Sequence, residues 1–142
     1  MSSTNNSFRL VLPDDWEDRS VYHFMGPDDS GVQHGLSLVI ERGVTTELSE
    51  YAEERIDTIV DALPNMQILK EEQRNLASGV SVYEVIYKWV TPDGTVSFHK
   101  LTYMIRDRIA YSFSANFSKK TMKTIRHEVD RIIESFEPGP AE

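Results

Sequence analysis

The fold of this chain is decided by residues 66–117, MQILKEEQRNLASGVSVYEVIYKWVTPDGTVSFHKLTYMIRDRIAYSFSANF. In this stretch, segments of alternating apolar and polar residues are separated by short turns, a pattern typical of consecutive β-strands. We expect the strands at Met66–Leu76, Val80–Val90, Val96–Asp107 and Ile109–Phe117. The segments between them are at most a few residues long, and connections this short force neighbouring strands to run antiparallel.

The last two of these strands are expected to have unlike faces, because successive side chains of a strand point to opposite sides of the sheet. In the last strand, one face carries Tyr111, Phe113, Ala115 and Phe117, and the other carries Ala110, Ser112, Ser114 and Asn116. In the strand before it, Phe98, Lys100, Thr102 and Met104 share one side, and His99, Leu101, Tyr103 and Ile105 share the other. Two interpretations of the small, hydroxylated face stay open: a surface that lets a helix backbone approach closely, or plain solvent-facing sheet.

Strands and helices are also expected on either side of this stretch. Alternation predicts strands at Phe8–Leu12, Ser20–Met25 and Gly35–Arg42. Thr45 or Thr46 can cap a helix of about 18 residues that ends before Pro64, and Ser118 can cap a second helix over Lys119–Phe136. The sequence therefore predicts an α+β domain, an antiparallel β-sheet with two amphipathic helices in the order β-β-β-α-β-β-β-β-α.

The two expected helices differ in the width of their apolar stripes. In the second helix, the apolar residues fall within an arc of roughly 100°, which is what one packing face needs. In the first helix they spread over roughly 180° and comprise Leu48, Tyr51, Ala52, Ile56, Ile59, Val60 and Leu63. Either this helix is wedged deeply between sheet and loops, or it also contributes to a groove or a subunit interface.

Composition narrows the classes of function. The 142 residues fit one domain over 1–142, with flexible ends at 1–7 and 137–142, and 39% of them are hydrophobic. The net charge of −8 repels a nucleic-acid backbone, and the absence of cysteine excludes disulfides and thiolate chemistry. Because the sequence has neither a signal-peptide pattern nor an apolar run long enough for a membrane span, we expect a cytoplasmic protein that does not insert into membranes.

Catalytic and metal-binding patterns are missing from the sequence. The four histidines are His23, His34, His99 and His127, and none of them has a second ligand-type residue convincingly placed on the same face. His127 with Asp130 is the nearest candidate, and a solvated charged helix face explains it more simply. A nucleophile elbow, a dinucleotide-binding glycine pattern and a P-loop are also absent. We therefore expect no enzymatic activity, no catalytic residue, no intrinsic metal and no cofactor.

Several stretches of the chain resemble a known family. They are Phe8–Ser20 (FRLVLPDDWEDRS), Ser37–Arg42 (SLVIER), Leu63-Pro64 and Glu134-Ser135-Phe136. Together they are similar to the DcrB-related family, which has a PsbP-like fold, and within that family the chain looks most like the Eag-type chaperones. Those chaperones are cytosolic homodimers that hold the apolar N-terminal transmembrane helices of PAAR- or Rhs-type effectors of type VI secretion.

The resemblance implies a client groove formed by the early strands and the first helix. Carried over position by position, it points to Val21, His23, Val39, Arg55, Ile59, Leu63 and Thr102 as client-binding residues. At the positions of His23 and Arg55, the relatives carry an apolar residue and an amide. The alternative is a PsbP-like interaction or scaffold module with a soluble partner, and a hydrolase with scattered catalytic residues is a third, more remote reading.

Overall fold

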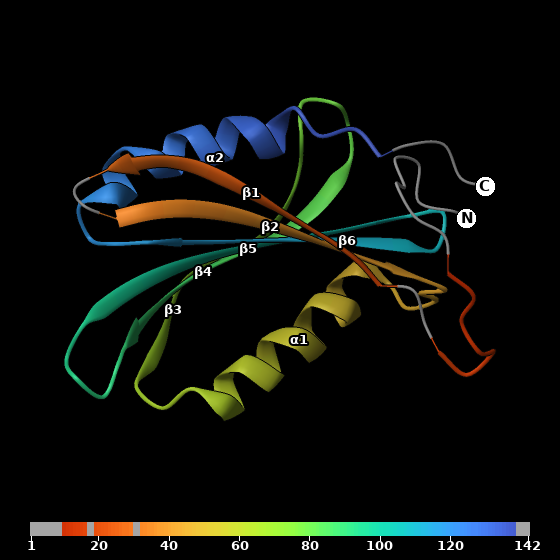
Figure 1. Ribbon diagram of the computed structural model, residues 1–142, viewed down its shortest axis with the longest axis horizontal. Helices are drawn as coiled ribbons and strands as arrows, with labels where there is room; N and C mark the ends of the chain where they lie inside the picture. The colour runs from red at the N-terminus through yellow and green to blue at the C-terminus, as the bar shows by residue number, and fades with distance from the viewer. Residues whose placement is uncertain (1–9, 17–18, 30–31, 139–142) are drawn as a thin grey trace.

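A computed structural model of the chain describes residues 10–16, 19–29 and 32–138. It shows one antiparallel sheet with a helix on each of its faces (Figure 1). The elements are, in order, β1 (Ser20–Asp29), β2 (Val32–Arg42), α1 (Leu48–Ala62), β3 (Met66–Asn75), β4 (Ser81–Val90), β5 (Val96–Arg106), β6 (Ile109–Phe117), the short 3₁₀ turn η1 (Thr121–Lys123) and α2 (Ile125–Glu134).

The expected fold class is confirmed, and the strands between 66 and 117 begin and end within a residue of the predicted positions. The strands expected at Ser20–Met25 and Gly35–Arg42 are longer in the structure, and the strand expected before them differs. Residues 8 and 9 of the predicted strand Phe8–Leu12 lie outside the described residues, and Leu10, Val11 and Leu12 are exposed without strand conformation. Most of the ends expected to be flexible, 1–7 and 137–142, also lie outside the described part, although Pro138 is buried.

The strands follow the spatial order β1-β2-β6-β5-β4-β3. The meander from β3 to β6 therefore forms one half of the sheet, and the β1–β2 hairpin is added along β6 through antiparallel pairing of β2 with β6. This arrangement leaves β1 and β3 as the two edge strands. All neighbouring strands are antiparallel.

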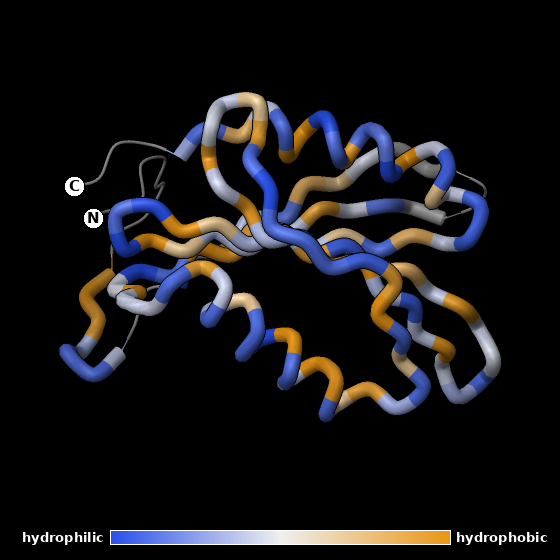
Figure 2. The backbone as a smooth tube through the Cα atoms, turned by 180° about the vertical axis from the view of Figure 1, so that it is seen from behind, coloured by the Kyte–Doolittle hydropathy of each residue, from blue (hydrophilic) through white to orange (hydrophobic). Residues whose placement is uncertain are grey.

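Each helix covers its own apolar cluster, so the sheet has a core on both faces. Beneath α2 lie Met104, Phe113 and Phe117 together with Val129 and Ile133 of the helix itself. Figure 2 shows apolar and polar positions interspersed along the strands. Where both faces of the sheet are covered, as along most of β4, consecutive residues are buried on opposite sides. The predicted faces of β5 and β6 are confirmed, since their two sets of residues belong to different clusters.

The second cluster lies beneath α1 and explains the wide apolar arc of that helix. It consists of Tyr51, Ala52 and Ile56 of α1 with Tyr83, Val85, Tyr87, Leu101, Tyr103 and Ala110 of the sheet. Leu48, Ile59 and Leu63 pack against its border, and only Val60 is largely exposed, at 45%. Packing within one chain therefore accounts for the arc, which is the first of the two explanations left open by the sequence.

Candidate functional site

Helix α1 covers only part of its side of the sheet. It packs on β4 and β5, where all five of the sheet's large cluster residues beneath it are buried. Among the described residues of β1, β2 and β6, those on the same side are exposed or half-buried, except for Ala110, which is buried in the cluster beneath α1. We call this uncovered surface the open face, and it consists of Val21, His23, Met25, Gly35, Ser37, Val39, Ser112, Ser114 and Asn116.

Strand register arranges the open face in three rows that run across the strands. Val21, Val39 and Ser112 form the first row, and His23, Ser37 and Ser114 form the second. Met25 pairs with Gly35 in the third row, which Asn116 completes on β6. No Asp, Glu, Lys or Arg belongs to these rows, whereas the whole chain has a net charge of −8. The open face is thus a neutral surface, apolar along β1 and small and polar along β6.

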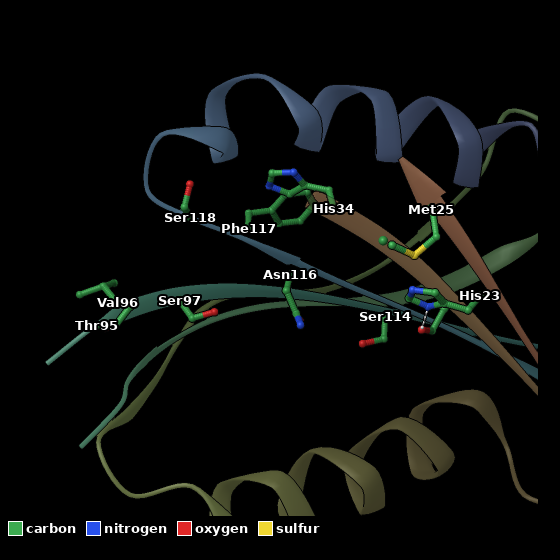
Figure 3. Close-up of a pocket in the computed structure, with 12 residues that line it drawn as sticks. His23, Met25, His34, Thr95, Val96, Ser97, Ser114, Asn116, Phe117 and Ser118 are labelled. Atoms are coloured by element: carbon green, nitrogen blue, oxygen red, sulfur yellow. Dashed lines mark hydrogen bonds between the residues drawn. The ribbon is translucent and has the colours of Figure 1, made fainter. Parts of the chain in front are cut away.

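A hollow of about 490 Å³ lies at the end of the open face that is nearest to the β4–β5 turn. Its walls include His23, Ser37 and Asn116 of the open face, and Ser97 and Ser118 from the neighbouring strand ends. In Figure 3, Asn116 points toward the α1 side of the sheet, while His34 and Phe117 lie on the side of α2. The volume is within the range of small-molecule sites in proteins.

His23 lies flat across the floor of the open face. Its Nδ1 and the Oγ of Ser37 are 2.9 Å apart and share a hydrogen bond. A Cβ atom added to Gly35 would come within 2.6 Å of His23 Cε1 and 2.7 Å of His23 Nε2. The absence of a side chain at position 35 therefore makes room for the imidazole ring, and the bond to Ser37 leaves Nε2 as the ring nitrogen that can face an incoming molecule.

A second histidine stands where the open face meets the part covered by α1. His99 Nδ1 donates to Asn116 Oδ1 at 2.5 Å, and its ring stacks on Tyr87 with centroids 4.6 Å apart. Burial lowers the pKa of His99, and the bond to Asn116 raises it by a smaller amount. His99 is consequently neutral at pH 7 and adds no charge to the site.

Charged residues of α1, of β2 and of the segment before β1 are paired with one another. Arg55 Nη2 donates to Glu41 Oε1 at 2.7 Å, Tyr51 Oη donates to the same oxygen at 2.8 Å, and Arg19 lies 3.1 Å from Glu41 Oε2. The guanidinium of Arg55 also lies 3.4 Å above the centre of the Tyr51 ring. Burial raises the pKa of Glu41, but the bond from Tyr51 and the two arginines outweigh it, so that the pKa is lowered. The carboxylate and Arg55 thus form a fixed wall beside the first row of the open face.

The structure brings together some of the residues predicted to bind a client. Val21, His23 and Val39 lie on the open face, and Arg55 borders it through Glu41. Ile59 and Leu63 instead pack against the cluster beneath α1. Thr102 points to the opposite side of the sheet, where it is 0% exposed beneath α2 and cannot be reached by a molecule on the open face.

The client-binding residues predicted from the sequence do not include most of the polar residues of the open face. Ser37 on β2 and Ser112, Ser114 and Asn116 on β6 form the polar part of the open face, and Gly35 makes room for His23. The signal was present in the alternation of β6, which predicts small polar residues on one side of the strand. What alternation could not provide was the position of α1, which decides the part of that side that stays open.

Comparison with known proteins places the chain in a family. The family model described as DcrB matches residues 9–135. The chain belongs to the DcrB family. No curated protein matches it in sequence.

Two solved structures have folds similar to that of this DcrB family member. A crystal structure of PA94 from Pseudomonas aeruginosa, titled a protein of unknown function and putative regulator, has a TM-score of 0.77 at 15% identity, covering 94% of this chain and 96% of that one. The solution structure of cyanobacterial PsbP (CyanoP) from Synechocystis sp. PCC 6803 has a TM-score of 0.59 at 13% identity, covering 94% of this chain and 100% of that one. At these identities the likeness concerns the fold, and it confirms a PsbP-like fold.

The described residues also bear on membrane insertion and metal binding. No helix in the described part of the chain is long and apolar enough to cross a bilayer. Within residues 10–16, 19–29 and 32–138, no three His, Asp or Glu side chains are grouped as a metal ion would require. The absence of an intrinsic metal, of a cofactor and of catalysis stays a prediction.

Proposed function

We propose that this DcrB family protein is a non-enzymatic chaperone whose open face shelters an apolar helix of another protein. The single observation that supports this proposal most directly is the uncovered, uncharged surface of β1, β2 and β6 beside α1. We further propose, from the resemblance to Eag-type chaperones, that the client is an apolar N-terminal transmembrane helix of a PAAR- or Rhs-type effector of type VI secretion, and that binding takes place in the cytosol.

The dimensions of the open face suit one helix. Strands lie about 4.8 Å apart, so three strands form a strip roughly 10 to 14 Å wide. An α-helix with its side chains is about 10 to 12 Å in diameter. A client helix placed on this strip would lie beside α1 and complete the helical layer on this side of the sheet.

The chemistry of the open face also suits an apolar helix. A charged or strongly polar client would lose hydration without finding a charged partner there, whereas Val21, Val39 and Met25 provide apolar contact. Serines in the middle of the floor are small enough for close approach of a helix backbone, and their hydroxyl groups can accept or donate hydrogen bonds. Small and hydroxylated residues have this role where helices pack within membranes.

A second candidate function is an interaction or scaffold module for a soluble partner. It is favoured by the edge strand β1, on which Val21, Phe24 and Met25 are each more than half exposed although they lie on both sides of the sheet. An exposed apolar edge strand can pair with a strand of another protein. In that case binding would depend on Phe24 as much as on Val21.

The proposal is tested by co-expressing the chain with a fusion protein that carries an effector's apolar N-terminal helices, followed by co-purification. Val21→Asp is the informative variant, because Val21 is 63% exposed and the change should leave the fold intact. We expect it to weaken capture at least about tenfold, since a carboxylate would be buried against an apolar helix without a partner.

Leu69→Asp is the matched control, because Leu69 is a similarly exposed apolar residue on the opposite edge strand β3. We expect it to retain capture. Equal capture by both variants would contradict the open face as the binding surface. Equal loss in Val21→Asp and Phe24→Asp would favour the strand-pairing alternative.

A further inference from the structure

We infer that His23 determines which helix the open face accepts, and that the preferred client helix carries an uncharged hydrogen-bonding side chain (Ser, Thr, Asn or Gln) among apolar ones. This inference rests on the proposed function and names the chemistry of its partner. It assigns to His23 a role in specificity.

The first observation behind this inference is a polar row in the middle of the open face. His23, Ser37 and Ser114 are consecutive partners in the strand register of β1, β2 and β6. Val21 and Val39 lie on one side of the row, and Met25 lies on the other. A helix that lies along the strands of this surface meets apolar, polar and again apolar contacts along its length.

The second observation is that the ring of His23 has a defined position. Its Nδ1 is bonded to Ser37 Oγ at 2.9 Å, and the ring atoms Cε1 and Nε2 occupy the space above Gly35. Because Nδ1 is engaged, Nε2 is the ring atom available to a client. Nε2 acts as a donor if Ser37 donates to Nδ1, and as an acceptor if Nδ1 carries the proton. Hydroxyl and amide groups can match either state.

The third observation is that none of the described residues that form the open face carries a charge beside His23. The open face holds no Lys or Arg that could neutralise a client carboxylate, and Arg55, at its border, is bound to Glu41 at 2.7 Å. A charged client side chain would lose hydration without compensation. A purely apolar client would cover Nε2 and leave it without a hydrogen bond, which is also unfavourable. An uncharged polar side chain avoids both costs.

The test uses two fluorescein-labelled peptides of about 20 residues, helical Ala/Leu sequences with terminal lysines for solubility, identical except for Gln or Leu at the centre. Binding to the full chain is measured by fluorescence anisotropy. We expect the wild-type protein to bind the Gln peptide about five- to tenfold more tightly, the effect of one hydrogen bond in a covered site.

Two variants test whether the imidazole ring of His23 causes the preference for the Gln peptide. His23→Leu should remove or reverse it, because an apolar residue then fills the central position. Gly35→Ala should also reduce it, since the added Cβ forces the ring away from Ser37 while the histidine itself is kept. His127→Leu is the control and should retain the preference, because it replaces an exposed histidine on α2, outside the open face.

The outcomes separate the inference from the function on which it rests. Equal binding of both peptides by the wild-type protein, or an unchanged preference in His23→Leu, would overturn the role of His23 and leave helix binding in place. Failure of the wild-type protein to bind either peptide would overturn helix binding and the inference with it. Circular dichroism of each variant confirms that a loss of preference does not come from unfolding.

Discussion

Glu84 on β4 and Lys100 on β5 form an ion pair inside the protein, with Lys100 Nζ 2.9 Å from Glu84 Oε2 and both side chains at most 5% exposed. Arg74 on β3 also binds Glu84, and Asp130 on α2 binds Lys100. A further link joins Arg74 to Glu134 of α2 at 3.3 Å. These contacts connect three strands to α2 on the side of the sheet opposite to the open face.

Lys100→Met should destabilise the protein by about 3 kcal/mol, because the buried Glu84 carboxylate then keeps only Arg74 as a partner and Asp130 loses Lys100. The measurement is the free energy of unfolding from urea denaturation. Lys70→Met is the control, since the Lys70–Glu72 pair is exposed and such pairs contribute at most about 1 kcal/mol. Similar values for the two variants would show that the Glu84–Lys100 pair contributes little.

The same pair predicts how stability depends on acid. Burial alone would raise the pKa of Glu84, but hydrogen bonds from Arg74 and Lys100 and their positive charges outweigh it, so that the pKa lies below 4.5. The contribution of Glu84 is therefore complete above the ordinary carboxyl pKa and is lost as the pH falls through the lowered value. Between about pH 5 and about pH 3, the free energy of unfolding should fall less steeply with decreasing pH in the double variant Glu84→Gln/Lys100→Met than in the wild-type protein. Parallel curves would contradict the lowered pKa.

The strand pattern was predictable because the period of two in residues 66–117 is strong and the turns are short. Register and sheet order were not, since the placement of the β1–β2 hairpin beside β6 depends on contacts between residues far apart in the chain. The network of Glu84 and Lys100 was also not visible in the sequence. Lys100 stands among Phe98, Thr102 and Met104, and only the position of α2 explains a lysine there.

The candidate site could be predicted in part for a similar reason. Val21, His23 and Val39 lie on one surface, because pairing of β1 with β2 fixes their common side, and their contact with a client stays a prediction. Thr102 was assigned from the resemblance by its approximate place in the strand. An offset of one residue along a strand moves a side chain to the other face of the sheet. The structure accordingly places Leu101 and Tyr103, but not Thr102, on the α1 side.

Ile59→Asp should destabilise the fold instead of acting only on binding. Ile59 packs against the cluster beneath α1, and a carboxylate at this position would have no buried partner, at a cost of about 2 to 4 kcal/mol. Thermal unfolding followed by circular dichroism measures the effect. Val60→Asp is the control, since Val60 is one residue away and largely exposed, and we expect a change within about 0.5 kcal/mol. A folded and stable Ile59→Asp protein would return Ile59 to the list of client-binding candidates.

We also expect a homodimer, with the edge strand β1 as its interface. Two copies of a chain with a net charge of −8 repel each other, but the segment Ser20–Met25 contains no Asp, Glu, Lys or Arg. The other edge, β3, carries Lys70, Glu71, Glu72 and Arg74, which is a common protection against edge pairing. Sedimentation velocity should show a dimer for the wild-type protein and for Leu69→Lys, and a monomer for Phe24→Lys. A wild-type monomer at high micromolar concentration would contradict this expectation.

The last prediction concerns His99, whose environment makes stability depend on pH near neutrality. Its pKa is below the ordinary histidine value of 6.5, chiefly because of burial, whereas the unfolded chain has the ordinary value. Between the two values the unfolded state binds a proton that the folded state does not bind, so the free energy of unfolding should decrease as the pH falls below about 6.5 and change little above it. Urea denaturation at about pH 7, 6 and 5 should show this decrease in the wild-type protein, and His99→Phe, which keeps a ring against Tyr87, should show less of it. His127→Phe is the control, because His127 is exposed on α2 and its replacement should leave the decrease unchanged. If His99→Phe and the wild-type protein lose stability in parallel, the proton is taken up elsewhere and burial of His99 has no measurable effect on folding.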